Sequence, residues 1–292
     1  MAATVGAFAG CHLAGATTPV GLGTIGAASA DMQPGLPTAV SPLDLEAVSE
    51  RGRLLCQLER LLGLAYEVGL PRVGAVGAEV LLPVASVDRG GRSGDVTFFR
   101  WQSGEAADAL GTPDPLLATR WLVVPILLDP DRVLENEQFS DSIEKGSETH
   151  LRLVGFVRAA QAAQALDPAG SWSMHPVREY VRNGTKRARQ TRVYMFARSE
   201  GAPDLEIVVA DRKRRTPAVA TSVVEQHPAG AYAAAELSLS VPQPGPMTVC
   251  RALRRGPAGA DVVVRTTQGL RWRIDGGDGR IERLPAHPSS TR

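Results

Sequence analysis

The sequence predicts an α+β fold that is mainly antiparallel and strand-rich, sandwich- or barrel-like, with one long N-terminal amphipathic helix and one or two short helices. Three observations lead to this class. Apolar residues recur at helical spacing between residues 42 and 68. From residue 76 onward, apolar residues alternate with a period of two, as in a strand. The back half of the chain is a series of short β-branched or alternating segments separated by Gly and Pro.

The 292 residues divide into three parts. Residues 1–40 form a Gly/Ala-rich arm, and residues 1–30 of it contain no Lys, Arg, Asp or Glu. Residues 41–284 are expected to form one strand-rich globular domain, with a candidate subdivision near residues 168–176, and residues 285–292 form a tail. A content of 43% hydrophobic and 22% charged residues is typical of a folded, soluble protein.

The first expected element is a helix over residues 42–68. Ser41 can cap it, and Pro42 suits the first helical position. The apolar residues at helical spacing form one stripe: Val48, Leu55, Leu58, Leu62 and Ala65. We expect this stripe to pack on the chain's own sheet, and docking on a partner is the alternative.

The elements that follow the helix are strands and two short helices. Strands are predicted at 78–87, 95–101 and 120–128. Pro125 lies inside the third of these, which indicates an edge strand or a bulge because proline cannot donate to the ladder. Helices are then expected at 132–144 and 158–166.

The back half is expected to consist mostly of strands. Its clearest feature is a hairpin in which strands 270–274 and 280–284 flank a glycine-rich turn. The other strands are predicted at 192–198, 205–211, 236–241, 247–253 and 261–267.

Charge is distributed unevenly along the chain, although the net charge is only +1. Residues 31–150 carry 10 Lys and Arg against 19 Asp and Glu, for a net charge of −9. Residues 151–215 carry 13 against 6, for +7, and residues 216–292 carry 9 against 6, for +3. An acidic front and a basic back predict an acidic partner for the back half or head-to-tail contact between copies, unless folding mixes the two surfaces.

Two basic clusters in the back half form the candidate nucleic-acid site. Several cations on one loop can neutralise phosphates and give salt-sensitive binding. The nine candidate residues are Arg182, Lys186, Arg187, Arg189, Arg192, Arg212, Lys213, Arg214 and Arg215. Tyr180 and Tyr194 are candidates for stacking on single-stranded bases. If the two strands that carry the clusters are antiparallel neighbours, we expect the clusters at opposite ends; the alternative to binding is a solvated basic face.

Catalytic candidates are few. His175 is followed closely by Arg178, Glu179 and Tyr180, which could orient it for proton transfer, but the proline after it favours a surface turn. Asp129 and Asp131 follow a predicted strand and could hold Mg²⁺, but Asp-Pro-Asp is equally an ordinary turn.

Neither a metal nor a cofactor is expected. No His stands at metal-ligand spacing from another His or Cys. Cys11, Cys56 and Cys250 are odd in number and widely spread, which favours a reducing compartment over a disulfide framework. The glycine motif of residues 21–26 matches the dinucleotide-binding pattern, but no strand and helix are predicted around it.

A location in the cytoplasm or nucleus is expected, because the arm resembles neither a signal nor a transit peptide and no apolar run is long enough for a membrane span. These observations favour a non-catalytic structural or assembly protein of a larger homo- or hetero-oligomeric complex, such as a capsid or shell. The expected partners are other copies or subunits held through the arm, and nucleic acid held through the basic loops. No small-molecule substrate and no membrane contact are expected. The alternatives are a nucleic-acid-binding or nucleic-acid-processing protein, and an enzyme that uses His175 or Asp129 and Asp131.

Overall fold

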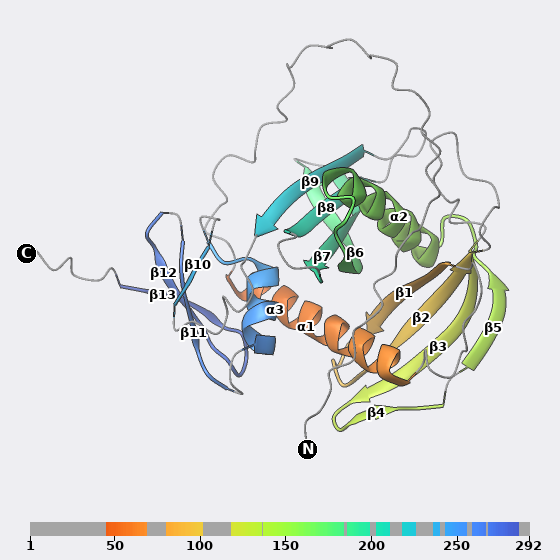
Figure 1. Ribbon diagram of the computed structural model, residues 1–292, viewed down its shortest axis with the longest axis horizontal. Coiled ribbons are helices and arrows are strands. Elements are labelled where there is room, and N and C mark those ends of the chain that lie inside the picture. The colour runs from red at the N-terminus through yellow and green to blue at the C-terminus, as the bar shows by residue number, and fades with distance from the viewer. Residues whose placement is uncertain are drawn as a thin grey trace, which may run out of the picture.

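Three β-sheets and three helices make up the part of the chain that this computed structural model describes (Figure 1). The described residues are 45–68, 80–101, 118–135, 137–183, 186–198, 203–210, 218–225, 236–239, 243–255, 259–266 and 268–285. The predicted class is confirmed: the fold is α+β, the strand pairs are antiparallel apart from one, and no sheet within the described residues closes into a barrel. The arm of residues 1–40 lies outside the described residues.

The long helix α1 spans Leu45–Val68 and runs through the middle of the molecule, from the C-terminal sheet to the first sheet (Figure 1). The predicted apolar stripe is confirmed, because all five of its residues are buried. Outside the stripe, Leu61 is also fully buried, and so is a charged residue, Glu59. The stripe packs on the chain's own sheets.

The first sheet has five strands. They are β1 (Val80–Val87), β2 (Ser93–Trp101), β3 (Thr119–Leu128), β4 (Asp131–Val133) and β5 (Glu137–Ser142). Strand β3 is central, with β2 on one side and both β4 and β5 on the other. Pro125 therefore does not mark an edge strand. On the side away from β2, the first half of β3 pairs with β5 and its last residues pair with β4. Pro125 lies between these two parts, where a missing N–H interrupts neither pairing.

The helix predicted at residues 132–144 is wrong, since this segment contains β4 and β5. Acidic composition favoured a helix there, whereas pairing with the long central strand β3 decides the local structure.

Helix α2 (Glu148–Leu166) confirms the predicted helix at 158–166 and begins ten residues earlier. Ser147 is its N-cap, and its Oγ accepts a hydrogen bond from the His150 N–H at 3.1 Å. Leu153 and Phe156 pack on the first sheet, whereas Ala159 and Ala163 pack on the middle sheet. The helix is therefore covered on two sides.

The middle sheet has the strand order β6-β7-β8-β9, antiparallel throughout. Its strands are β6 (Trp172–Asn183), β7 (Lys186–Ala197), β8 (Asp204–Ala210) and β9 (Ala218–Glu225). On β7, Val193 and Met195 pack against α2, whereas Tyr194 and Phe196 join the cluster around α1. Strands β6 and β9 were not predicted. Strand β6 runs through the proposed subdivision at 168–176 and joins directly to α2 by a short turn.

The C-terminal sheet has the order β10-β11-β12-β13, and its β10–β11 pair is parallel. The strands are β10 (Glu236–Ser238), β11 (Val262–Arg265), β12 (Arg271–Ile274) and β13 (Ile281–Leu284). The predicted terminal hairpin is confirmed, with Ile274 paired to Ile281. Gly279 in its turn has a φ of +69°, a conformation that glycine adopts without strain.

The strand predicted at 247–253 is wrong, because Pro246–Arg255 forms helix α3. Pro246 occupies the first helical position, and the Gly245 N–H donates to Thr248 Oγ1 at 3.3 Å. Val249 and Ala252 pack on the C-terminal sheet, while Met247 packs toward α1. Thr and Val in so short a segment resembled a strand, although the contacts follow helical spacing.

No helix within the described residues is both long enough and apolar enough to cross a membrane.

Candidate functional site

The predicted basic region between residues 182 and 192 lies on a two-stranded ribbon. Strands β6 and β7 pair from Trp172 and Ala197 to Asn183 and Lys186. Strand β8 pairs with β7 only between Gln190 and Met195. The ribbon therefore extends past the end of β8 as a β-hairpin (Figure 1).

An exposed aromatic–cation pair lies on this ribbon. Tyr180 is 66% exposed, and the Arg189 guanidinium carbon lies 4.8 Å from the centre of its ring. The two residues are direct register partners on β6 and β7. Tyr194, the other stacking candidate, is only 3% exposed and belongs to the core around α1, so the expectation that it stacks on bases is wrong.

Arg192 is neutralised inside the sheet. Its Nε lies 2.8 Å from Glu179 Oε1, and its NH1 group donates to Glu206. Arg51 on α1 also approaches Glu179, at 3.9 Å. Burial lowers the pKa of Arg192, but the carboxylates of Glu206 and Glu179 help to outweigh burial and raise it, so the charge is retained and balanced by the sheet.

The remaining basic candidates are placed less completely. Arg182, Lys186 and Arg187 are described only as backbone positions at the tip of the ribbon, where Arg182 is paired with Arg187. Residues 212–215 lie outside the described residues. Their strand, β8, ends at Ala210 opposite Gln190. Antiparallel pairing places the start of β7 beside the end of β8, so the described strand ends give no support for clusters at opposite ends, and the position of the second cluster stays a prediction.

His175 does not lie in a surface turn. It is 2% exposed within β6, and its Nε2 lies 2.6 Å from Glu59 Oε1 on α1. Ser173 Oγ donates to the same carboxylate oxygen. The partner of His175 is therefore a glutamate distant in the sequence. It is none of the three residues that follow His175 in the chain, Arg178, Glu179 and Tyr180.

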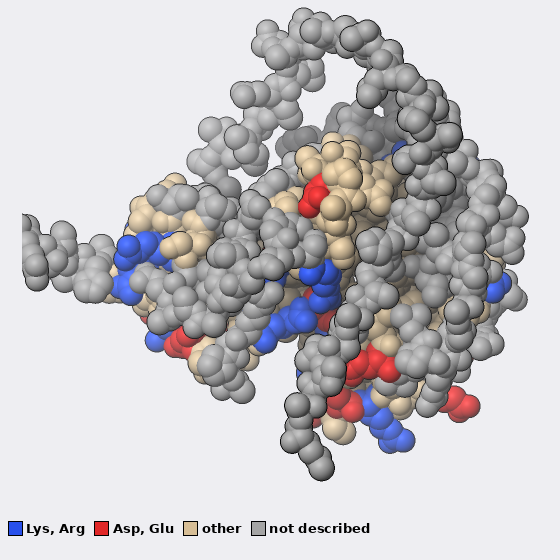
Figure 2. Space-filling view, viewed as in Figure 1, with Lys and Arg blue, Asp and Glu red and all other residues tan. Residues whose placement is uncertain are grey.

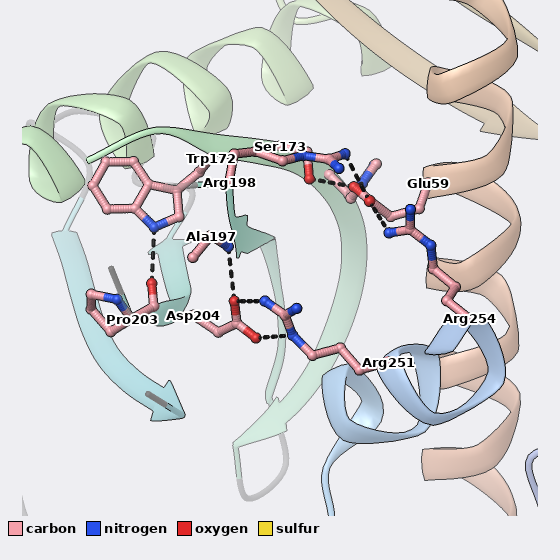
Figure 3. Close-up of polar contacts among 10 residues, drawn as sticks. Glu59, Trp172, Ser173, Ala197, Arg198, Pro203, Asp204, Arg251 and Arg254 are labelled. Atoms are coloured by element: carbon pink, nitrogen blue, oxygen red, sulfur yellow. Dashed lines mark hydrogen bonds and ion pairs between the residues drawn. The ribbon is translucent and has the colours of Figure 1, made fainter. Parts of the chain in front are cut away.

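Two arginines complete the shell around Glu59. Arg198 at the end of β7 donates to Oε2 at 2.9 Å, and Arg254 on α3 donates to the same oxygen (Figure 3). Glu59 itself has no exposed side-chain surface. Burial raises the pKa of this carboxyl group, but the His175 contact and the two guanidinium groups outweigh burial, so the pKa lies well below its usual value.

This buried cluster, made of Glu59, Ser173, His175, Arg198 and Arg254, favours a structural role over proton transfer. Both oxygens of Glu59 already accept two partners each. The Ser173 hydroxyl donates a hydrogen bond to the buried carboxylate of Glu59. A nucleophilic serine needs a base and also an open approach for the substrate to its Oγ.

A second ion pair connects α3 to the middle sheet beside this cluster. The Arg251 guanidinium donates to both carboxylate oxygens of Asp204 on β8, and the Ala197 N–H donates to Asp204 Oδ1 at 2.8 Å (Figure 3). Figure 2 shows basic side chains gathered on the same face, beside the region where Figure 1 draws α3. Arg198 and Arg254 are each about half exposed, while the donor group of each reaches inward to Glu59.

Asp129 and Asp131 lie in and after the turn between β3 and β4, and both are exposed. Asp131 forms an ion pair with Arg60 on α1, with 2.7 Å between Arg60 NH2 and Oδ2. No group of three His, Cys, Asp or Glu residues suited to a metal was found in the described ranges. The turn interpretation of this sequence therefore fits its surroundings.

Sequence reasoning missed Glu59, Asp204 and the arginines that bind them. One signal was present: Glu59 stands in the sequence between Leu58, Leu61 and Leu62, on the apolar side of an amphipathic helix. A charged residue in that position predicts a buried ion pair. Its partners come from β6, β7 and α3, and no local pattern identifies them.

No protein-family model matches the chain, and no curated protein matches it. Among solved structures, the chain has a weak similarity to the crystal structure of the WD40 domain of SCAP from fission yeast, with 7% sequence identity and a TM-score of 0.18. The match covers 72% of this chain and 45% of the WD40 chain. This chain therefore spans less than half of the length of the WD40 chain. A TM-score this low carries no argument about fold or function.

Proposed function

We propose that this protein is a non-catalytic structural component of a nucleoprotein complex and that it binds nucleic acid through the β6–β7 ribbon. The observation that carries the proposal is the Tyr180–Arg189 pair, an exposed ring and a cation on a ribbon that extends beyond the sheet. Nucleic-acid-binding proteins combine aromatic rings, which stack on bases, with cations, which contact phosphates. A two-stranded β-ribbon also fits the major groove of DNA.

The charges around the ribbon support this proposal. Arg192, at the base of the ribbon, is balanced by Glu179 and Glu206, whereas the tip carries Arg182, Lys186 and Arg187 in its sequence. Strand β8 ends at Ala210, beside the ribbon, and residues 212–215 follow it in the sequence.

The test is binding of labelled single-stranded and duplex DNA and RNA to the full chain, measured by fluorescence anisotropy over a series of salt concentrations. We expect the association constant to fall steeply with salt, because bound cations release counterions from the phosphates. Lys186→Ala combined with Arg187→Ala and Arg189→Ala should weaken binding and reduce the salt slope by about 2 to 3. Binding that is absent at low salt would contradict the proposal.

Two comparisons separate a stacking contact from a general loss of charge. Tyr180→Ala should weaken binding to single strands by about 1 to 3 kcal/mol, whereas Tyr180→Phe, which keeps the ring, should bind like the parent. Arg283→Ala removes one exposed cation from β13 in the C-terminal sheet and serves as the charge-matched control. The single variant Arg189→Ala is measured beside it. Equal losses of affinity for Arg283→Ala and Arg189→Ala would show that only net charge matters.

The assembly part of the proposal rests on the uncharged arm and is tested separately. The native mass of the particle, measured by light scattering with and without nuclease, distinguishes a monomer, a protein oligomer and a nucleoprotein. Deleting residues 1–33 should weaken association and leave the strand-rich fold intact by circular dichroism. If the truncated chain assembles like the parent, the arm has no part in assembly.

A further inference from the structure

Two cysteine thiols meet where α1 packs against α3. Cys56 lies on α1 and Cys250 on α3, and the two thiols are close enough for each to shift the pKa of the other. Cys250 is fully buried, whereas Cys56 is partly exposed and packs against the same core cluster. Both are free thiols. The 193 positions between them in the sequence give no sign of this contact, which depends entirely on how the two helices pack.

The two helices approach closely at this point. A Cβ atom added to Gly52, one turn before Cys56, would lie 2.5 Å from Val249 Cβ and 3.0 Å from the Pro246 carbonyl oxygen. Gly52 and Cys56 lie four residues apart on one face of α1, and Cys250 directly follows Val249. A disulfide requires Cα atoms about 4.4 to 6.8 Å apart, and the close approach of the two helices beside both cysteines favours such a separation.

The surroundings make the two thiols chemically unequal. The neighbouring Cys250 thiol has the largest influence on the pKa of Cys56 and lowers it. Burial opposes this shift, and the charges of Arg254 and Arg60 add to it. Burial raises the pKa of Cys250 well above its ordinary value, and the contact with Cys56 raises it further. Cys56 is therefore the thiol that ionises first and the one that a reagent can reach. Cys250 is the buried partner that can resolve a bond formed at Cys56.

We propose that Cys56 and Cys250 form a reversible redox pair that closes to an α1–α3 disulfide by exchange with a small-molecule disulfide. The Cys56 thiolate attacks one sulfur of the reagent, which forms a mixed disulfide and releases one thiolate. Cys250 then loses its proton to solvent and attacks the Cys56 sulfur, which closes the protein disulfide and releases the second thiolate. The two protein thiols lose two electrons, and the reagent disulfide is reduced to two thiols.

The bond would tie the C-terminal sheet to the rest of the molecule covalently. Helix α3 carries that sheet on Val249 and Ala252, and it contacts Glu59 and Asp204 through Arg254 and Arg251. Closing the disulfide adds a covalent link to a joint that otherwise depends on packing and ion pairs.

The test uses the full chain, incubated natively with oxidised glutathione, then alkylated and digested without reduction. We expect a cross-linked peptide pair that contains Cys56 and Cys250, and an intact mass lower by two hydrogen atoms. The same result is expected for Cys11→Ser, because Cys11 is not part of the pair. A bond between Cys11 and either thiol, or separate glutathione adducts on both Cys56 and Cys250, would overturn the proposal.

Two single variants test the order of the steps. Cys250→Ser should stop at the mixed disulfide, so a glutathione adduct accumulates on Cys56. Cys56→Ser should gain an adduct on Cys250 at least tenfold more slowly, because that thiol is buried and protonated. Equal rates for the two variants would contradict the assigned roles. If either variant fails to fold, the peptide map of the parent chain still decides whether the bond forms.

Discussion

At the scale of single residues, the fold depends on a buried charge. A carboxylate removed from water is costly unless cations and donors surround it, and Glu59 has His175, Ser173 and two guanidinium groups within reach. These partners come from the middle sheet and from α3. One side chain of α1 therefore contributes to the position of two other parts of the molecule.

Glu59→Gln should destabilise the protein by about 3 kcal/mol, because the amide leaves Arg198, Arg254 and His175 without the charge that they surround. The measurement is urea unfolding followed by circular dichroism. Glu67→Gln is the matched control, an exposed glutamate on the same helix, and should change the unfolding free energy by less than about 0.5 kcal/mol. A Glu59→Gln midpoint equal to that of the control would exclude the role that we assign to the cluster.

The contribution of Glu59 should also depend on pH. Its pKa in the folded protein is lowered, so the stabilisation is complete above the pKa of a carboxyl group in the unfolded chain, about 4.3, and is lost as pH falls toward the folded value. The difference in unfolding free energy between the parent and Glu59→Gln should be constant from about pH 7 to pH 5.5 and shrink below about pH 4. A difference that grows on acidification would show that the sign of the shift is wrong.

At the scale of elements, the contact between α1 and α3 explains two glycines of α1 in different ways. A side chain at Gly52 would meet Val249 and the Pro246 carbonyl group, whereas Gly63 has nothing within 4 Å of an added Cβ atom. The first glycine permits the helices to approach each other. The second only lowers the intrinsic helix propensity of α1.

Gly52→Ala should therefore destabilise the protein, since overlap in a packed interface costs about 1 to 3 kcal/mol and exceeds the gain in helix propensity of about 1 kcal/mol. Gly63→Ala, the matched control on the same helix, should stabilise by about 0.5 to 1 kcal/mol. Thermal or urea unfolding of the two variants checks this. Stabilisation by both substitutions would mean that α1 and α3 are not in close contact.

At the scale of the whole molecule, α1 and α3 connect the three sheets. Helix α1 packs on the first sheet and contacts the middle sheet through Glu59, while α3 packs on the C-terminal sheet and reaches Asp204 through Arg251. Val48 of α1 also packs on the C-terminal sheet, and Arg53 NH1 donates to the Asp278 carbonyl oxygen at 2.9 Å. The Arg251–Asp204 ion pair adds an attachment through α3, which carries the sheet.

Asp204→Asn should loosen the C-terminal sheet selectively. We expect hydrogen exchange in β11–β13 to quicken at least tenfold, with exchange in β2 and β3 unchanged, because the first sheet has its own core with α1 and α2. Hydrogen-exchange mass spectrometry of the full chain measures both regions at once. Asp261→Asn, which removes an exposed ion pair with Arg273, is the control and should leave both regions like the parent. Uniform quickening across all sheets would contradict a selective joint.

Local patterns predicted the elements that have a strong period of their own. The stripe on α1 and the terminal hairpin were identified because helical spacing and a glycine turn between alternating strands are visible without tertiary contacts. The segments 132–144 and 247–253 were assigned wrongly, since each is short and its state is chosen by what it pairs with. Strand β6 was missed because Pro176 resembled a turn, whereas the pairing of β6 with β7 extends through this residue.

The sequence by itself determined the class of this protein: an amphipathic N-terminal helix, antiparallel strands and a basic region on one of them. These follow from hydrophobic period and composition, which are local properties. Only the tertiary structure decided which polar, charged and aromatic side chains are exposed for binding and which are paired or buried inside the molecule. It placed Tyr180 at the surface and Tyr194 in the core, neutralised Arg192, buried His175 on Glu59 and brought Cys56 to Cys250. Each of these outcomes depends on a partner from another element, and the identity of such a partner is set by packing rather than by sequence spacing.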